Sequence, residues 1–342
     1  MNPANILSPD ILTLITTYKC SAACHNCCFS CSPRYPNKMS ISDMKYYIKT
    51  AVEKFPSIQV AVFTGGECTL LKDDLLKAIE YCKELRLTTR IVSNGYWATT
   101  KEKTTYMINK LAGAGLDEIN ISTGKDHMQY IPISNVCNIM KEASENADIQ
   151  TVAIAIEDRE DYVRNDPYII LDEELQKIDE EMRNKVLLLK SPWMNFKDRK
   201  MNLNKTTEVY REGGCSNIFK GIQVNPNGQL LACCGLSCEY SPFLKLGKFS
   251  DRLYEIYEGQ FRDLLKIWLY TEGPLEILRY ITGDKICSGK HDCDYCLDLL
   301  TKESNVKKLL DIGNDKAKDI MIKFNIKIKT ASYEKEEISE TL

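Results

Sequence analysis

The 342-residue sequence lacks an apolar run long enough to span a membrane, so we expect no transmembrane helix. Residues 1–10 lack a basic stretch followed by a long apolar one, and we therefore expect no signal peptide and a cytoplasmic location. Excess charge is also missing. The formal net charge of -3 disfavours a general nucleic-acid binder, because such proteins are usually basic.

Cysteine, by contrast, is abundant, with 15 residues. In a chain without a secretion signal, clustered cysteines are more often metal ligands or catalytic thiols than disulfides. Three of the five between positions 20 and 31 are spaced C-x3-C-x2-C, namely Cys20, Cys24 and Cys27. Three thiolates can hold a cubic iron–sulfur cluster and leave its fourth iron open for a substrate or cosubstrate. The spacing alone also permits a zinc site.

Strand-like and helix-like segments alternate through the first half of the chain. We predict strands at residues 11–17, 58–63, 88–93, 118–122, 150–156 and 186–189. We predict helices at residues 40–55, 73–85, 101–112, 134–146 and 172–183, and a solvated acidic loop at residues 157–161. Such alternation predicts an α/β fold with parallel strands and right-handed crossovers, either doubly wound or a full or partial barrel.

Unusual residues follow four of these strands. They are Cys20, the turn Gly65-Gly66-Glu67, the pair Ser93-Asn94, and Ser122. The carboxyl edge of a parallel α/β sheet carries the active site. Paired glycines let backbone groups approach a ligand closely, and Glu67 can pair with an ammonium group. We therefore expect the functional site at this edge.

The second half carries its own cysteines around a predicted β-hairpin. Residues 221–234 read as two strands joined by a Pro-Asn-Gly turn. If Cys233 and Cys234 lie on the second strand, their side chains point to opposite faces. The other cysteines of this half are Cys215, Cys238, Cys287, Cys293 and Cys296. Farther on, we predict one helix at residues 261–281 and a charged helical tail at residues 302–342 that frays from about residue 334.

With these motifs in place, the chain resembles the radical S-adenosylmethionine (SAM) superfamily over roughly residues 11–195. The resemblance implies a partial (β/α)6 barrel with a 4Fe-4S cluster on Cys20, Cys24 and Cys27. It also implies that the open iron binds the amino and carboxylate groups of SAM. Gly65, Gly66 and Glu67 would contact the amino group, and Ser93, Asn94 and Ser122 the carboxylate or ribose. One departure is Asn26, at a position that is often aromatic in the family and packs near the adenine.

The second half resembles the SPASM or twitch extensions of these enzymes, which hold an auxiliary iron–sulfur cluster. Together the two halves resemble radical SAM peptide epimerases, which convert L-residues of a ribosomally made peptide to D-residues. The implied auxiliary 4Fe-4S ligands are Cys215, Cys233, Cys293 and Cys296, and Cys238 or Cys287 could replace one of them. Cys234 would return a hydrogen atom to the substrate. Cys28 and Cys31 are surplus to the first cluster, and His127 either touches substrate or is structural.

The resemblance implies three domains: a barrel at residues 1–195, an auxiliary-cluster region at residues 196–300 and a helical tail at residues 301–342. It implies two partners, a precursor peptide and an electron donor such as flavodoxin or ferredoxin. Thioether or carbon–carbon crosslinking of a peptide, and activation of a protein by a glycyl radical or formylglycine, remain open as reactions. A non-enzymatic zinc or iron–sulfur protein is the alternative from a different class.

Overall fold

A computed structural model describes residues 2–158, 166–191, 213–283, 286 and 291–341. Its centre is one nine-stranded sheet with the order β6-β5-β4-β3-β2-β1-β7-β8-β9. The first six strands are β1 (Ile11–Thr17), β2 (Val60–Gly65), β3 (Thr88–Ser93), β4 (Glu118–Thr123), β5 (Thr151–Glu157) and β6 (Val186–Ser191).

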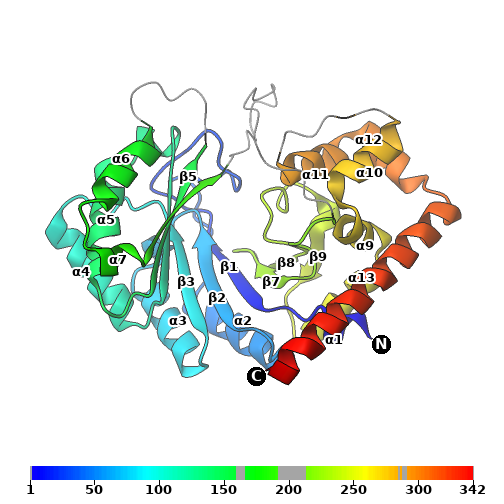
Figure 1. Ribbon diagram of the computed structural model, residues 1–342, viewed down its shortest axis with the longest axis horizontal. Helices are drawn as coiled ribbons and strands as arrows, with labels where there is room; N and C mark the ends of the chain where they lie inside the picture. Colours follow the sequence, from blue (N-terminus) through cyan, green and yellow to red (C-terminus); the bar gives the residue numbers. More distant parts are fainter. Residues whose placement is uncertain (1, 159–165, 192–212, 284–285, 287–290, 342) are drawn as a thin grey trace.

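These six strands are parallel and lie in the order of the sequence. A doubly wound sheet would reverse its strand order at a switch point, so this arrangement is the partial barrel and not the doubly wound alternative. Figure 1 shows the connecting helices on the outer side of the curved sheet. They are α2 (Ile41–Lys54), α3 (Asp73–Glu84), α4 (Lys101–Gly113), α5 (Ile133–Glu145), α6 (Pro167–Leu175) and α7 (Glu180–Arg183). The predicted α/β fold is confirmed.

The sheet continues from the barrel into the second half of the chain. Strand β7 (Gly221–Val224) pairs in parallel with β1, and β8 (Gln229–Leu231) and β9 (Lys245–Lys248) follow in antiparallel order. The predicted hairpin is confirmed at β7 and β8. Asn225 Oδ1 accepts hydrogen bonds from the backbone N–H groups of Asn227 and Gln229, and Gly228 supplies the left-handed conformation of the turn at φ +68°.

A second apolar core lies under the C-terminal helices, shown in yellow to red in Figure 1, and includes the buried Trp268. These helices are α9 (Leu264–Thr271), α10 (Gly273–Thr282), α11 (Asp292–Thr301), α12 (Glu303–Leu310) and α13 (Asn314–Thr341). By contrast, α8 (Leu253–Gly259) packs on the core of the barrel through Leu253 and Tyr257. The short α1 (Pro3–Ile6) contacts α13. No helix within the described ranges is long and apolar enough to cross a membrane.

Three predicted helices were wrong in extent. The helix predicted at residues 172–183 is instead two helices, α6 and α7. Helix α6 begins earlier than predicted, because Asp166 caps it and Pro167 lies in its first turn, and it ends at Leu175. The helix at residues 261–281 is broken before Pro274, where Gly273 has φ +83° and the proline has no backbone N–H to donate. The last helix continues to Thr341, since its final residues contain helix formers and neither glycine nor proline.

Candidate functional site

Three cysteines predicted to bind a cluster lie together in the loop after β1. Cys20 and Cys24 are buried, Cys27 is half-buried, and all three pack in one small group with Cys31. Burial, with the nearby Glu67 carboxylate and the Cys27 thiol, raises the pKa of Cys20 to about 11. Burial, with the thiols of Cys27 and Cys20, raises the pKa of Cys24 to about 12. Metal binding must displace such protons, and clustered soft thiol donors fit an iron–sulfur cluster.

Gly65 and Gly66 set the approach of β2 to this loop. Gly65 adopts φ +130°, and a Cβ on it would lie 2.4 Å from the backbone oxygen of Thr17. A Cβ on Gly66 would lie 2.2 Å from the backbone oxygen of Lys19, the residue before Cys20. Because neither carries a side chain, Gly66 N donates to Thr17 O at 2.7 Å and Glu67 N to Lys19 O at 2.9 Å. The two glycines therefore hold the cysteine loop directly against the end of β2.

The Glu67 carboxylate joins the ends of β2 and β3. It is fully buried, and burial raises its pKa while its hydrogen-bond donors act in the opposite direction. Oε1 accepts hydrogen bonds from the Thr69 hydroxyl at 2.6 Å and the Ser93 hydroxyl at 2.9 Å, and Oε2 accepts one from Asn94 N at 2.8 Å. All of these hydrogen-bond donors belong to the protein itself, and the bonds to Glu67 orient Ser93 and Asn94.

Asn94 carries this network into the cysteine loop. Its Nδ2 donates to Ser21 Oγ at 3.0 Å and lies 3.4 Å from Cys20 Sγ. Trp97 Nε1 donates to Ser93 Oγ at 3.2 Å, so the hydroxyl between Glu67 and Trp97 is fixed in direction. The structure therefore brings together the first cysteine, the acidic turn and the Ser93-Asn94 pair.

The loop after β4 supports the far side of the cysteine loop. Asp126 Oδ2 accepts a hydrogen bond from Asn26 N at 2.8 Å, and the buried Asn26 Oδ1 has no partner among the described residues. Ser122 Oγ and His127 Nε2 lie 3.2 Å apart. An orphaned acceptor beside the cysteines fits a bound group that carries a hydrogen-bond donor, such as the amino group of an adenine.

Glu157 corrects a prediction made from the sequence. The sequence predicts that it lies in a solvated acidic loop, but Glu157 is the last residue of β5 and its side chain is buried, with an exposed fraction of 2%. Its Oε2 accepts a hydrogen bond from Lys125 N at 2.8 Å. Its strand is buried on both faces, so a carboxylate at its end needs a donor and finds one in the neighbouring loop.

The cysteines of the second half form another group. Burial raises the pKa of Cys233, and so do the neighbouring thiols of Cys238, Cys215, Cys296 and Cys293. A Cβ on Gly235 would lie 3.2 Å from Cys293 Sγ and 3.3 Å from Cys233 Sγ, so both sulfur atoms face the space that this glycine leaves open. Ser237 hydrogen-bonds to Cys293 and to Cys296. This buried set of soft donors fits an iron–sulfur cluster.

Neither cysteine group, as far as the structure describes it, is a single-ion site. Among the described residues, no three His, Cys, Asp or Glu side chains form a group that could hold a metal ion. The thiols that hold the corners of a cubic cluster are farther apart than the ligands of one ion. Cys287, a possible alternative ligand, lies outside the described residues.

Cys233 and Cys234 differ in environment, although for a different reason than predicted. Strand β8 ends at Leu231, so the two cysteines lie beyond it and strand alternation does not apply. Cys233 is 5% exposed, whereas Cys234 is an exposed residue whose Sγ lies 3.8 Å from Asn217 Oδ1. Cys234 is also within electrostatic reach of Lys220.

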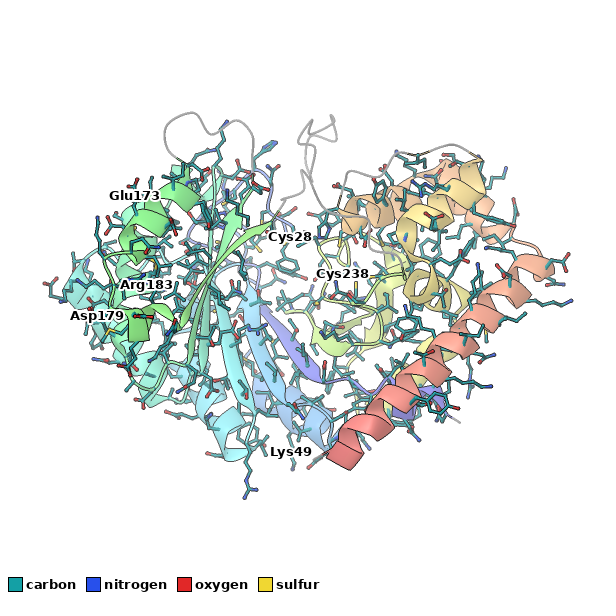
Figure 2. The ribbon with its side chains drawn as sticks, viewed as in Figure 1. Cys28, Lys49, Glu173, Asp179, Arg183 and Cys238 are labelled. Atoms are coloured by element: carbon teal, nitrogen blue, oxygen red, sulfur yellow. The ribbon has the colours of Figure 1, made fainter. Side chains whose placement is uncertain are left out.

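Direct contacts join the two cysteine groups. The Tyr18 hydroxyl donates to Glu239 Oε1 at 2.6 Å, and the Ser30 and Tyr240 hydroxyls lie 2.9 Å apart. In Figure 2, Cys28 from the first loop and Cys238 from the loop after β8 lie near each other between the barrel and the C-terminal helices. The loop after β8 is therefore bonded directly to the loop that carries Cys20, Cys24 and Cys27.

Sequence reasoning missed several residues of this site. Thr69, Asp126, Glu157, Glu239 and Tyr240 all make the contacts described above. A signal was available for Glu157, because it ends an apolar strand at the same edge as Cys20 and Ser93. The others lie in loops whose course the sequence does not indicate.

Comparison with known proteins agrees with this geometry. Residues 14–124 match the model of the Radical SAM superfamily. The putative peptide biosynthesis protein YydG of Bacillus subtilis (strain 168) is 31% identical over 134 residues. The aligned region is 38% of this chain and 41% of that protein, so it spans less than half of the relative.

Two solved structures align with most of the chain. A polyhistidine-tagged form of anSMEcpe with bound AdoMet aligns with a TM-score of 0.50 at 12% identity, over 94% of this chain and 98% of that chain. BtrN in complex with AdoMet and 2-DOIA aligns with a TM-score of 0.44 at 14% identity, over 75% of this chain and 87% of that chain. The first likeness supports the fold of almost the whole chain.

Proposed function

We propose that the protein is a radical SAM enzyme that modifies a ribosomally made peptide by L-to-D epimerisation. The observation that carries the enzyme class is the group of Cys20, Cys24 and Cys27 bonded to the Glu67 network at the carboxyl edge of the barrel. The name of the relative YydG, a putative peptide biosynthesis protein, supports a peptide as the substrate.

In this proposal Cys20, Cys24 and Cys27 hold a 4Fe-4S cluster, and SAM binds beside it. When bound, the cluster supplies one electron to the sulfonium of SAM, which yields methionine and a 5′-deoxyadenosyl radical. Gly65 and Gly66 offer backbone groups to the SAM amino group, and Glu67 positions Ser93 and Asn94 toward the carboxylate or ribose. Ser122 contacts SAM from β4. The orphaned Asn26 Oδ1 is placed to accept a hydrogen bond from the adenine.

An auxiliary 4Fe-4S cluster is proposed on Cys215, Cys233, Cys293 and Cys296, with Cys238 or Cys287 as possible replacements. Their mutual proximity supports this ligand set, in which Cys233, Cys293 and Cys296 are buried and Cys215 is half-buried. Residues 1–195 would then be the catalytic barrel, 196–300 the auxiliary-cluster region and 301–342 a helical tail.

The proposed chemistry balances in three transfers. The 5′-deoxyadenosyl radical would take the Cα hydrogen atom of the substrate residue, which gives 5′-deoxyadenosine and leaves a carbon radical. The Cys234 thiol returns a hydrogen atom to the opposite face and is left as a thiyl radical. One electron from flavodoxin or ferredoxin and one proton from solvent restore the thiol. Because Cys234 is exposed, its S–H hydrogen exchanges with solvent. We also propose that the protein acts in the cytoplasm, where flavodoxin and ferredoxin are found.

The experiment uses the reconstituted enzyme, SAM, a reductant and candidate precursor peptides in deuterated water. We expect one deuterium at the Cα of a D-residue, measured by mass spectrometry and chiral amino-acid analysis. The Cys234→Ala variant should still consume SAM but form no D-residue. A crosslinked peptide that has lost two hydrogen atoms, formed equally well by Cys234→Ala, would contradict epimerisation and favour a crosslinking enzyme.

A further inference from the structure

The segment that carries Cys215 is docked on the joint between α9 and α10. Cys215 N donates to Leu269 O at 2.8 Å. A Cβ on Gly214 would lie 2.1 Å from Tyr270 O, so only glycine permits this approach at φ +86°. The carbonyl groups of Gly213 and Tyr270 are thereby brought to one place. Each of these carbonyl oxygens needs a hydrogen-bond donor, and because they lie close together one group can donate to both.

Lys327 of α13 is that donor. Its Nζ donates to Gly213 O and, at 2.7 Å, to Tyr270 O, and it lies 4.1 Å from the centre of the Tyr270 ring. These partners come from positions 57 and 114 residues away in the sequence. One half-buried ammonium group therefore joins the Cys215 segment, the end of α9 and the last helix.

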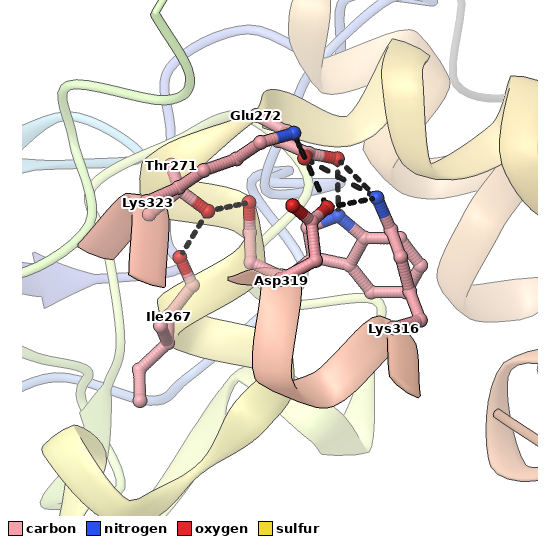
Figure 3. Close-up of polar contacts among 7 residues, drawn as sticks. Ile267, Thr271, Glu272, Lys316, Asp319 and Lys323 are labelled. Carbon is pink, nitrogen blue, oxygen red and sulfur yellow. Dashed lines mark hydrogen bonds and ion pairs between the residues drawn. The ribbon is translucent and has the colours of Figure 1, made fainter. Parts of the chain in front are cut away.

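A separate ion-pair cluster fixes the part of α13 that precedes Lys327. Glu272 Oε1 lies 3.3 Å from Lys316 Nζ and 2.6 Å from Lys323 Nζ, and Glu272 Oε2 accepts a hydrogen bond from Trp268 Nε1 at 2.7 Å. Figure 3 shows these contacts between α13 and the junction of α9 and α10. Lys323 lies one helical turn before Lys327, so this anchor determines where Lys327 meets the Cys215 segment.

The charge of Lys327 reaches the cysteine group. Burial lowers the pKa of Lys327, and the neighbouring Cys215 thiol acts in the opposite direction, which places the two groups within electrostatic reach. In the part of the chain that the structure describes, no carboxylate lies within ion-pair distance of Lys327. The negative group that faces the same cysteines is Asp292, near Cys215 and Cys296.

We propose that Lys327 is a positioning residue that fixes the Cys215 segment and, by its positive charge, raises the reduction potential of an iron–sulfur cluster bound there. The inference rests on the auxiliary cluster of the proposed function. Charge and hydrogen bonding near an iron–sulfur cluster are among the features that set its potential. A positive charge beside the cluster stabilises the reduced form, which carries one more electron.

The test is made in full-length protein with Cys20, Cys24 and Cys27 changed to Ala, so that only the auxiliary cluster can bind. Lys327→Gln keeps a donor for the two carbonyl groups and removes the charge, Lys327→Arg keeps both, and Lys327→Met removes both. Lys329→Met is the matched control, because it removes an exposed lysine of the same helix that takes part in neither the Lys327 contacts nor the Glu272 ion pairs. The measurements are iron content and a redox titration followed by electron paramagnetic resonance.

We expect Lys327→Gln to bind iron fully and to have a more negative midpoint potential. A unit charge about 10 Å away, at an effective dielectric of about 20, changes a one-electron equilibrium by about tenfold, or about 59 mV. Lys327→Arg and Lys329→Met should keep the parent potential, and Lys327→Met should also lose iron.

An unchanged potential in Lys327→Gln with full iron overturns the charge effect and leaves the auxiliary cluster in place. Full iron in Lys327→Met overturns the positioning role. If the parent protein with the three alanines binds no cluster, both the auxiliary cluster and this inference fail. The iron content distinguishes that outcome from a cluster that binds but whose potential does not depend on Lys327.

Discussion

The substitution Gly66→Ala tests how the barrel holds the cysteine loop. An added Cβ would lie 2.2 Å from the backbone oxygen of Lys19, whereas carbon and oxygen atoms normally approach to about 3.3 Å. Relief requires the two backbones to separate by about 1 Å and weakens the 2.9 Å hydrogen bond from Glu67 N to Lys19 O. Overpacking and a lost hydrogen bond together should cost about 2–4 kcal/mol of unfolding free energy.

The assay is urea denaturation of the protein, followed by iron analysis and SAM binding after anaerobic reconstitution. Because Lys19 precedes Cys20, we expect Gly66→Ala to bind less iron and to bind SAM more weakly. Gly113→Ala at the end of α4 is the matched control: no atom lies within 4 Å of its Cβ position, and the change should be neutral or stabilise by up to about 1 kcal/mol. A Gly66→Ala variant with wild-type stability and full iron would refute the reasoning.

Three further predictions concern single side chains. Glu67→Gln replaces a carboxylate that accepts hydrogen bonds from four donor groups by an amide that must also donate. The free energy of unfolding should fall by about 1–3 kcal/mol and the Kd for SAM should rise, and unchanged values would contradict the network. Burial lowers the pKa of His127 from 6.5 to about 4, so the unfolded state takes up the proton first and stability is lost as the pH falls from 6.5 towards 4. Wild-type protein should therefore lose about 1–2 kcal/mol more than His127→Gln between pH 7.5 and pH 5 in urea titrations, and parallel pH profiles would oppose this. Tyr18→Phe removes the 2.6 Å hydrogen bond to Glu239 and leaves this partly buried carboxylate with one donor fewer. We therefore expect the free energy of unfolding to fall by about 1–2 kcal/mol. Thermal unfolding measures this loss, with Tyr106→Phe, at an exposed tyrosine, as the control.

The barrel was largely predictable from the sequence, because its strands are apolar runs separated by amphipathic helices. Strand β3 was predicted at its observed bounds, 88–93, and β1 at 11–17. Strand order was not predictable, since parallel pairing depends on contacts between distant residues. The broken helix at Gly273-Pro274 was missed even though its breaker is local, because apolar residues at helical spacing continue on both sides of it.

The site was predictable where spacing or strand ends mark it. The group of Cys20, Cys24 and Cys27, the glycines before Glu67 and the Ser93-Asn94 pair converge at one edge as expected. Nothing in the sequence marks loop carboxylates such as Asp126 and Glu239 as part of the site. Their roles depend on distant partners, Asn26 and Tyr18, which only the folded chain brings near.

The most direct test of radical SAM chemistry is the reductive cleavage of SAM by the reconstituted, dithionite-reduced protein, followed by chromatography of 5′-deoxyadenosine. We expect the wild-type protein to form 5′-deoxyadenosine and methionine in equal amounts, and Cys24→Ala to form neither. Cys82→Ala, which changes a cysteine buried in α3, controls for the loss of any thiol. Wild-type protein that carries a reduced cluster and binds SAM but forms no 5′-deoxyadenosine would contradict the central claim.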